Sequence, residues 1–199
     1  MTLIVGLTGG IASGKSTISA YYQSLNVPII DADLEARLAV EAGEPAYHKI
    51  IAYFGTEILQ KDGQLNRKKL GEIVFVDEEE RKVLNSIVHP EVRKRMNKKQ
   101  KEAIDDGAKV VILDIPLLFE NKLHENCDKT ILVYVDEEIQ LQRLMKRNLL
   151  SEKDAWIRIQ AQMPLIKKRL LADEIINNNG TMEEAKTQAK NLLRKWSVL

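Results

Sequence analysis

The sequence of 199 residues lacks the features that mark secreted, membrane-spanning and strongly charged proteins. Its only cysteine is Cys127, so an internal disulfide is excluded, and the count fits a reducing compartment. Thirty basic residues stand against twenty-nine acidic ones, and the formal net charge of +1 provides no overall attraction to nucleic acid or to a membrane surface. The first apolar run, residues 3–7, is too short for a signal peptide, and the run at residues 110–119 is too short for a membrane span.

These absences lead us to expect a cytoplasmic protein with no membrane partner and no nucleic-acid partner. The sequence leaves the oligomeric state open, and we expect a monomer or a weak homo-oligomer. We interpret Cys127 as a small hydrophobic residue near the start of a strand. A composition of 44% hydrophobic and 30% charged residues is typical of a globular chain, and the length predicts one domain with insertions.

The most informative stretch is the one that follows the apolar run at residues 3–7. It fits the P-loop pattern G-x-x-x-x-G-K-[ST], in which glycines let backbone N–H groups converge on phosphate oxygens at the start of a helix. The lysine of this pattern reaches the β- and γ-phosphates of a nucleotide, and the serine holds Mg²⁺. The less specific alternative is a structural glycine-rich turn. The predicted phosphate-binding residues are Gly9, Gly10, Ile11, Ala12, Ser13, Gly14, Lys15, Ser16 and Thr17.

Two aspartates follow the second predicted strand. A helix over residues 16–25 and a strand over residues 27–30 complete a βαβ unit, so the carboxyl ends of both strands meet at one edge of a parallel sheet. Asp31 and Asp33 should therefore emerge beside the phosphate loop. If the chain turns into a helix near Leu34, the two side chains diverge, and one caps the helix while the other is free for the site. The alternative is that both are N-caps of a helix over residues 34–42.

Residues 34–107 show helical patterns and no convincing central strand. We predict helices over residues 46–53, 67–75 and 78–88, the last behind Asp77 as a cap, with a turn at Asp62 and Gly63. A helical block inserted between two sheet strands predicts a subdomain that grips a second substrate. His89 and Pro90 should interrupt the last helix, and His89 is either a helix-end residue or a substrate contact.

A basic run, Arg93 to Lys101, has no interleaved aromatic residue. Nucleic-acid grooves usually combine charge with stacking rings, so we interpret the run as a solvated helix face, with an accessory role toward an anionic substrate as the alternative. Residues 109–114 and 130–135 are predicted buried strands. Asp114, at the end of the first, either holds Mg²⁺ through water or fixes the following loop by backbone hydrogen bonds.

The C-terminal third predicts a lid. Arg143 and Arg147 lie one helical turn apart on a helix over residues 140–148, as suits two planar donors that close over phosphates. They could instead pair with Glu137 or Glu138 on the surface. A new helix begins at Ser151. A short strand at residues 175–176, a turn at 177–180 and an amphipathic helix over 182–196, with Trp196 in a packing role, complete the chain.

The motifs taken together resemble those of the dephospho-CoA kinase family, in the family's order and over nearly the whole chain. The stretches that carry the resemblance are residues 6–16 (GLTGGIASGKS), 31–33 (DAD), 62–67 (DGQLNR), 89–90 (HP), 116–120 (PLLFE), 142–147 (QRLMKR), Gln162 and 172–180 (ADEIINNNG). The resemblance implies transfer of the γ-phosphoryl group of ATP to the ribose 3′-hydroxyl of dephospho-CoA, with Mg²⁺. One departure is Ala12, where the family commonly has glycine, so a left-handed backbone there would be mildly strained.

The resemblance also implies an α/β fold of three layers, with a five-stranded parallel sheet, a helical CoA-binding insertion and a short lid. We expect a nucleotide-binding core of residues 1–33, 108–137 and 172–199, a helical acceptor domain of residues 34–107, and a lid of residues 138–171. Asp33 is the expected base, with Lys15, Arg143 and Arg147 as further catalytic residues. Asn178 and Gly180 should lie near adenine, and the acceptor should meet Asp31, Asp33, Arg67, His89, Leu117, Leu118 and Glu120.

Three other functions need weighing. Another small-molecule P-loop kinase, acting on a nucleoside, nucleotide or sugar, shares every phosphate argument and differs only in its acceptor motifs. A GTPase switch is disfavoured because no D-x-x-G follows the P-loop and no N-K-x-D motif occurs in the sequence. A nucleic-acid-binding module could rest only on residues 93–101.

Overall fold

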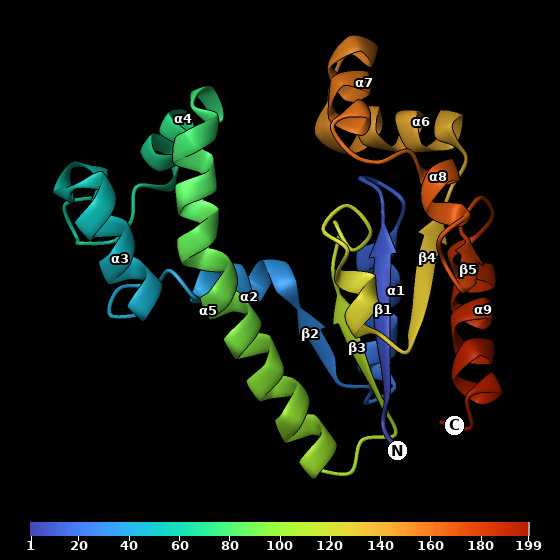
Figure 1. Cartoon of the computed structure of the whole chain (residues 1–199). Coiled ribbons are helices and arrows are strands. Elements are labelled where there is room, and N and C mark those ends of the chain that lie inside the picture. The colour runs from blue at the N-terminus through green and yellow to red at the C-terminus, as the bar shows by residue number, and fades with distance from the viewer. Residues whose placement is uncertain (199) are drawn as a thin grey trace. The chain divides into compact units, whose positions relative to one another are not determined.

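The computed structural model describes residues 1–198, and the chain divides into two compact units. The first comprises residues 1–30 and 103–198, and the second comprises Asp31–Glu102. A single five-stranded sheet has the order β2-β3-β1-β4-β5 (Figure 1). Its strands are β1 (Leu3–Gly9), β2 (Ile29–Asp31), β3 (Val110–Asp114), β4 (Lys129–Tyr134) and β5 (Glu174–Asn177).

The central strand β1 pairs in parallel with β3 on one side and with β4 on the other. Strand β5 in turn pairs in parallel with β4. The apolar runs that predicted β1, β3 and β4 are buried, as strands covered on both faces must be. The expected five-stranded α/β sheet is confirmed, and the central position of β1 puts its last residue, Gly9, between the ends of β3 and β4.

One face of the sheet is covered by α1 (Lys15–Ser24) and α9 (Met182–Lys195). Tyr22 of α1 is fully buried there, and its hydroxyl donates a hydrogen bond to the Ala189 carbonyl oxygen over 3.1 Å. Burial raises the pKa of the Tyr22 phenol well above its ordinary value. Trp196 is half-buried against the same core, so the packing role predicted for it is confirmed.

The other face is covered in part by the segment after β3, by η2 (Leu123–Asn126) and by α8 (Leu165–Arg169). Leu118 of that segment is fully buried, and a side chain at Gly6 would overlap it. Cys127 also adjoins Gly6, two residues before β4, and is partly buried. Burial raises the pKa of its thiol to about 11, which agrees with the predicted role as a small hydrophobic residue.

Helices α6 (Glu137–Asn148) and α7 (Glu152–Gln160) make up most of the predicted lid segment. They pack together through Leu144, Ala155 and Ile159, and Ile11 and Ala12 lie against this cluster. Ser151 caps α7, because its hydroxyl accepts a hydrogen bond from the Asp154 N–H over 3.2 Å. The helix break predicted before Ser151 is therefore confirmed.

The second unit is helical, as predicted, and carries a small core of its own around Ile50, Ile58, Leu65 and Leu70. Asp77 caps its last helix by accepting hydrogen bonds from the N–H groups of Glu79 and Glu80. The elements are α2 (Ala32–Leu38), α3 (Pro45–Phe54), η1 (Thr56–Ile58), α4 (Arg67–Val76) and α5 (Glu78–Asp105).

The prediction that His89 and Pro90 interrupt a helix is wrong. Helix α5 runs through Pro90 for 28 residues, and it includes the whole basic run. Proline lacks a backbone N–H group, so the helix loses only the hydrogen bond from residue 90 to the Ser86 carbonyl oxygen. Ser86 is exposed, so water can hydrogen-bond to that oxygen instead. The bonds on either side of that one gap hold the helix together.

Four residues of the basic run lie on a solvated helix face, and the other two form ion pairs with a buried carboxylate. Arg95 donates to the Glu35 carboxylate over 3.1 Å, and Lys99 forms a second ion pair with Glu35. Only 1% of the Glu35 side chain is exposed, and a buried carboxylate needs such partners. The pairs join α2 to α5. The four residues that do not contact Glu35 are exposed, and they are Arg93, Lys94, Lys98 and Lys101.

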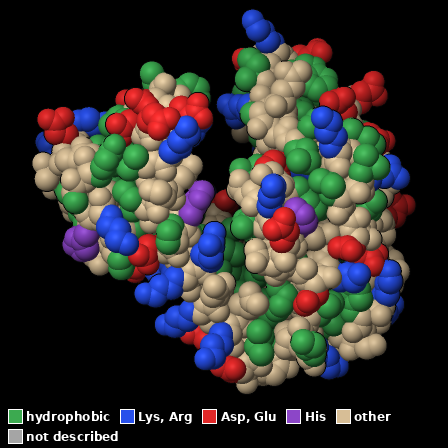
Figure 2. Space-filling view, viewed as in Figure 1, with side chains coloured by type: hydrophobic (Ala, Val, Ile, Leu, Met, Phe, Trp, Pro, Cys, Tyr) green, Lys and Arg blue, Asp and Glu red, His purple; other side chains and the backbone are tan. Residues whose placement is uncertain are grey.

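Charges of both signs are interspersed over the face of the molecule seen in Figure 2, in line with the net charge of +1. Within residues 1–198, no helix is both long enough and apolar enough to cross a membrane.

Candidate active site

The P-loop connects the end of β1 at Gly9 to the start of α1 at Lys15. Gly14 is the N-cap of α1 with φ at +93°, a left-handed conformation that only glycine adopts without strain. A Cβ atom at Gly14 would also overlap the side chain of Asn178. The N–H groups of Lys15 and Ser16 point out of the first helical turn, where no intrahelical acceptor exists, so they are available to phosphate oxygens.

Ala12 also has a left-handed backbone, with φ at +59°. This is the strained position that the sequence indicates, because the Cβ atom of alanine crowds the neighbouring carbonyl in that conformation. The half-buried Ala12 side chain lies against the cluster that joins α6 to α7. The loop is thus held in this conformation by the helices above it.

Two glutamines hold the neighbouring peptide groups of Ile11. The Ile11 N–H donates to Gln162 Oε1 over 2.8 Å, and Gln140 Nε2 donates to the Ile11 carbonyl oxygen over 2.8 Å. Gln140 is 4% exposed and comes from α6. Gln162 belongs to the motifs identified in the sequence, whereas nothing in the sequence singles out Gln140.

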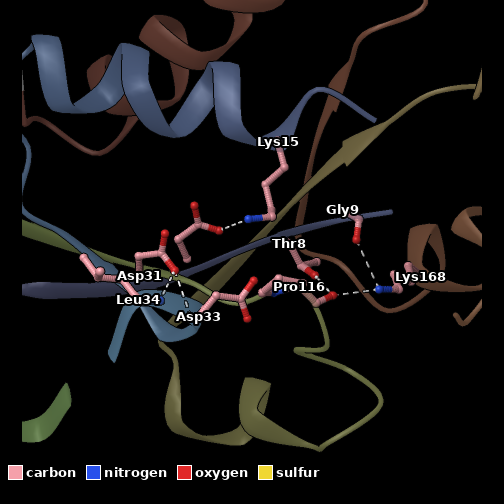
Figure 3. A network of polar contacts seen from close by, with 9 residues as sticks. Thr8, Gly9, Lys15, Asp31, Asp33, Leu34, Pro116 and Lys168 are labelled. Carbon is pink, nitrogen blue, oxygen red and sulfur yellow. Dashed lines mark hydrogen bonds and ion pairs between the residues drawn. The ribbon is translucent and has the colours of Figure 1, made fainter. Parts of the chain in front are cut away.

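The Lys15 ammonium forms an ion pair with the carboxylate of Asp114, at the end of β3 (Figure 3). Asp114 is 3% exposed. The two sequence-based hypotheses for Asp114, a water-mediated Mg²⁺ ligand or a loop-fixing residue, did not include this pair. It places the P-loop lysine at the carboxyl edge of the sheet, where β1 and β3 end side by side.

Arg143, Asn178 and the P-loop form a chain of hydrogen bonds. Asn178 Nδ2 donates to the Ser13 carbonyl oxygen over 2.7 Å, and Arg143 Nη1 donates to the Asn178 carbonyl oxygen over 2.9 Å. Arg147 is exposed, and its Nε donates to Asn148 Oδ1. Across residues 1–198 neither arginine has an ion pair with Glu137 or Glu138, so the predicted alternative is not observed.

Gly180 is exposed in the turn between β5 and α9, two residues after Asn178. A Cβ atom at Gly180 would overlap the Glu184 carboxylate. That carboxylate accepts a hydrogen bond from the Thr181 N–H and completes the capping box of α9. The turn therefore has a structural reason for glycine that is independent of any nucleotide.

In the segment after β3, the residues predicted to contact the acceptor differ in their burial and in their hydrogen bonds. Leu117 is 39% exposed, whereas Leu118 is buried in the core. Glu120 accepts hydrogen bonds through Oε1 from Lys168 Nζ over 2.8 Å and from the Met163 N–H over 3.2 Å. Lys168 was missed by sequence reasoning, because a lysine on a short polar helix has no pattern that reveals its burial.

In the helical unit, Asp31 and Asp33 have different environments (Figure 3). Asp31 is the N-cap of α2, and its Oδ1 accepts hydrogen bonds from the N–H groups of Asp33 and Leu34 over 2.8 and 3.0 Å. The Asp33 side chain is exposed and accepts no hydrogen bond from residues 1–198. The alternative that both residues are caps is therefore wrong.

Arg67 and His89 lie elsewhere in the same unit. Arg67 begins α4 and donates from Nη2 to the Arg37 carbonyl oxygen, at the end of α2, over 3.2 Å. His89 is exposed on α5. Both therefore have surface available to a ligand.

The residues fit a P-loop Mg²⁺ ion. The Ser16 side chain is exposed in the first turn of α1. Among residues 1–198 no group of three or more His, Cys, Asp and Glu side chains could hold a metal. Mg²⁺ in nucleotide sites keeps several waters and is bound by one or two protein oxygens together with the substrate phosphates, so the Ser16 hydroxyl could serve as such an oxygen.

Comparisons with known proteins identify the family of the chain. The family model described as dephospho-CoA kinase matches residues 3–184. The chain is 57% identical over 198 residues to the dephospho-CoA kinase of Oceanobacillus iheyensis and 54% identical over 199 residues to that of Bacillus anthracis, with 100% of each chain covered.

Two solved structures are also similar, and in each case the match covers 98% of this chain and 97% of the other. They are TT1252 from Thermus thermophilus, with a TM-score of 0.82 and 34% identity, and the dephospho-CoA kinase from Campylobacter jejuni, with a TM-score of 0.74 and 32% identity. Full-length identity above one half, together with the P-loop geometry, establishes that the chain belongs to the dephospho-CoA kinase family.

Proposed function

We propose that this chain transfers the γ-phosphoryl group of ATP to the ribose 3′-hydroxyl of dephospho-CoA, giving CoA and ADP. By family it is an ATP-dependent kinase of the final step of CoA biosynthesis. The observation that carries the proposal is a P-loop with its lysine in the first turn of α1, in a chain 57% identical to a relative named for this reaction.

On the ATP side, the enzyme has to position phosphates and neutralise charge, because the transition state of phosphoryl transfer is loose and spreads charge over the equatorial oxygens. The N–H groups of Lys15 and Ser16 and the positive end of α1 would bind the phosphates. We infer that ATP draws the Lys15 ammonium from Asp114 onto the β- and γ-phosphates. Ser16 would hold Mg²⁺, which when bound neutralises phosphate charge.

On the acceptor side, we propose that Asp33 orients the 3′-hydroxyl and takes its proton. Both Asp31 and Asp33 are candidates by sequence, but the Asp31 carboxylate is occupied by two N–H groups at the start of α2. The exposed Asp33 carboxylate keeps its acceptor capacity for a substrate hydroxyl. We also propose that the helical unit binds dephospho-CoA, with Arg67 and His89 as contacts.

We propose that the segment after β3, in the first unit, also contacts the acceptor. The exposed Leu117 offers apolar surface. Leu118 is buried, so we assign it a supporting role beneath the acceptor rather than a side-chain contact. Glu120 has a carboxylate that faces Lys168, and its Oε2 accepts no hydrogen bond from residues 1–198, so it retains capacity for a ligand or a water molecule.

We propose that the segment of α6 and α7 closes over ATP. Arg143 and Arg147 would then supply planar donors to the phosphate oxygens, whose charge rises during transfer. Arg143 already contacts the Asn178 carbonyl oxygen, next to the site proposed for adenine at Asn178 and Gly180. Arg147 is exposed and free to change its rotamer on closure.

The test is an acceptor panel. The purified chain is incubated with ATP, Mg²⁺ and, in parallel, dephospho-CoA, a nucleoside, a nucleoside monophosphate and shikimate, and ADP release and product mass are measured. We expect ADP release with dephospho-CoA alone, and a new phosphate on the ribose 3′-oxygen by NMR. Lys15→Ala is the control that should lose transfer. Faster turnover of another acceptor, or no ADP with dephospho-CoA, contradicts the proposal.

The cellular location and the oligomeric state of the enzyme are also proposals. We propose a cytoplasmic location because a single cysteine suits a reducing compartment. We likewise keep the expectation of a monomer or a weak homo-oligomer, which light scattering at the assay concentration would test.

A further inference from the structure

Lys168, in the short helix α8, is a fully buried lysine. Its side chain is 0% exposed, a state that lysine adopts almost only when its charge is paired. An ammonium group has three N–H donors and no acceptor. The surroundings of Nζ should therefore offer three acceptors.

Three acceptors do surround Nζ, from the end of β1 and from the segment after β3, and Figure 3 shows two of them, the carbonyl oxygens of Gly9 and Pro116. The carbonyl oxygens of Gly9 and Pro116 lie 3.3 and 3.0 Å from Nζ, and Glu120 Oε1 lies 2.8 Å from it. Gly9 is the first residue of the P-loop pattern. Pro116 and Glu120 belong to the segment of residues 115–120, which we call the acceptor loop.

Neighbouring hydrogen bonds strengthen the same junction. Thr8 Oγ1 donates to the Pro116 carbonyl oxygen over 2.9 Å, so the last residues of β1 contact the acceptor loop a second time. The Met163 N–H donates to Glu120 Oε1 over 3.2 Å, which ties the chain before α8 to the same carboxylate. Lys168 is the only group at this junction that contacts both Gly9 and Glu120 among the described residues.

We propose that Lys168 is a positioning residue, whose ammonium holds the start of the P-loop and the acceptor loop in one fixed arrangement. This proposal deepens the proposed function and rests on it, because the acceptor loop contacts dephospho-CoA only if that function is right. Lys168 itself touches no substrate. It acts by fixing the backbone of Gly9 relative to the loop that carries Leu117 and Glu120.

The expected effect is large because in-line phosphoryl transfer depends on the separation of donor and acceptor. A misplacement of about 1 Å can reduce turnover by about 10²-fold. Lys168→Met keeps the length and the apolar stem of the side chain and removes the ammonium. We expect kcat to fall by roughly 30- to 100-fold, with the KM for ATP changed by less than about threefold, because the phosphate-binding N–H groups of α1 are not attached to Lys168.

Lys167→Met is the matched control. Lys167 precedes Lys168 in the sequence and is exposed, and Lys167→Met makes the same chemical change. The kcat of the Lys167→Met enzyme should therefore match that of the wild type. Turnover is expressed per ATP-binding site, which removes any loss of folded protein from the comparison. If Lys168→Met and Lys167→Met have kcat values within threefold of each other, the proposal is overturned.

A second pair of variants separates positioning from charge balance. Lys168→Met leaves the Glu120 carboxylate without its cation, so the melting temperature should fall by on the order of 10 °C. Adding Glu120→Gln removes that charge and should restore much of the stability. The kcat of the double variant should remain at least tenfold below that of Glu120→Gln alone. Equal kcat values would show that Lys168 only balances Glu120 and would refute the proposal.

Hydrogen exchange tests the proposal without relying on activity. In Lys168→Met, peptides covering residues 9–14 and 115–120 should both exchange faster than in Lys167→Met, since both lose an attachment. Faster exchange in neither segment, or in only one, contradicts a link between the two loops. If the wild type shows no transfer to dephospho-CoA while both segments loosen, the proposed function fails and the link between the loops stands.

Discussion

The strained alanine of the P-loop allows a quantitative prediction. Ala12 has φ at +59°, and a left-handed backbone costs an L-residue about 1–2 kcal/mol relative to glycine. Ala12→Gly removes that strain. The substitution also removes a half-buried methyl group that packs on the cluster between α6 and α7. The free energy lost with this methyl group is less than the ~0.8 kcal/mol expected for a fully buried one. The greater freedom of glycine in the unfolded chain costs a further 0.4–1 kcal/mol or so.

These opposing terms nearly cancel, so Ala12→Gly should change the free energy of unfolding by no more than about 1 kcal/mol, which for a chain of this size is a melting-temperature change of roughly 2–4 °C. The dissociation constant for ATP should stay within about fivefold of the wild type, on the neutral or improved side. Ala12→Val is the opposite case, because a branched Cβ atom is a genuine outlier at positive φ. We expect Ala12→Val to lower the melting temperature by at least about 5 °C and to weaken ATP binding at least tenfold.

The assay is thermal unfolding followed by calorimetric titration with a non-hydrolysable ATP analogue, for both variants and for Ala12→Asn. Asparagine tolerates the left-handed region, so it should resemble alanine despite its larger size. Similar stability for Gly, Ala and Asn at this position, with a clearly lower stability for Val, is the signature of backbone strain. A valine variant with unchanged stability, or a glycine variant with more than tenfold weaker ATP binding, would refute the reasoning.

Three further predictions concern aspartates. Asp33→Asn should lower kcat by about 10²-fold or more while ATP affinity and melting temperature stay unchanged, because its carboxylate has no partner to lose; nearly normal turnover would remove Asp33 from the role of base. Asp31→Ala, in contrast, should destabilise the fold by about 1 kcal/mol through loss of the α2 cap, visible as a lower melting temperature. Burial acts to raise the pKa of Asp173, but hydrogen bonds from Thr130 and the charge of Lys129 outweigh it and lower that pKa below its ordinary 3.8. The ionised carboxylate therefore stabilises the fold above about pH 4, and the advantage of wild type over Asp173→Asn in urea unfolding should disappear as the pH falls through that lowered value. An advantage that persists unchanged at pH 2 would contradict this assignment.

Most elements of the fold could be predicted because the signals are local. The strands ending at Gly9 and Asp114 are largely apolar runs, and the helix starts at Glu152 and Glu78 each directly follow a side-chain cap. The one wrong element, the break at Pro90, shows the limit of a local rule. A proline lowers helix stability by a bounded amount, and a long helix with neighbouring hydrogen bonds can absorb it.

The sequence alone determined the phosphate loop and the family, since each depends on residues adjacent in the chain or on motifs in a fixed order. It marked Ala12 as strained only if its backbone were left-handed, and the structure supplied that conformation. Only the tertiary structure decided which aspartate caps α2, and only it paired Glu35 with α5 and buried Lys168 between two loops. The ion pairs and the burial depend on contacts between residues about 50 to 160 positions apart. The choice of cap depends on the exact residue at which α2 begins. No short-range pattern encodes them, because burial and pairing arise only when separate elements pack together.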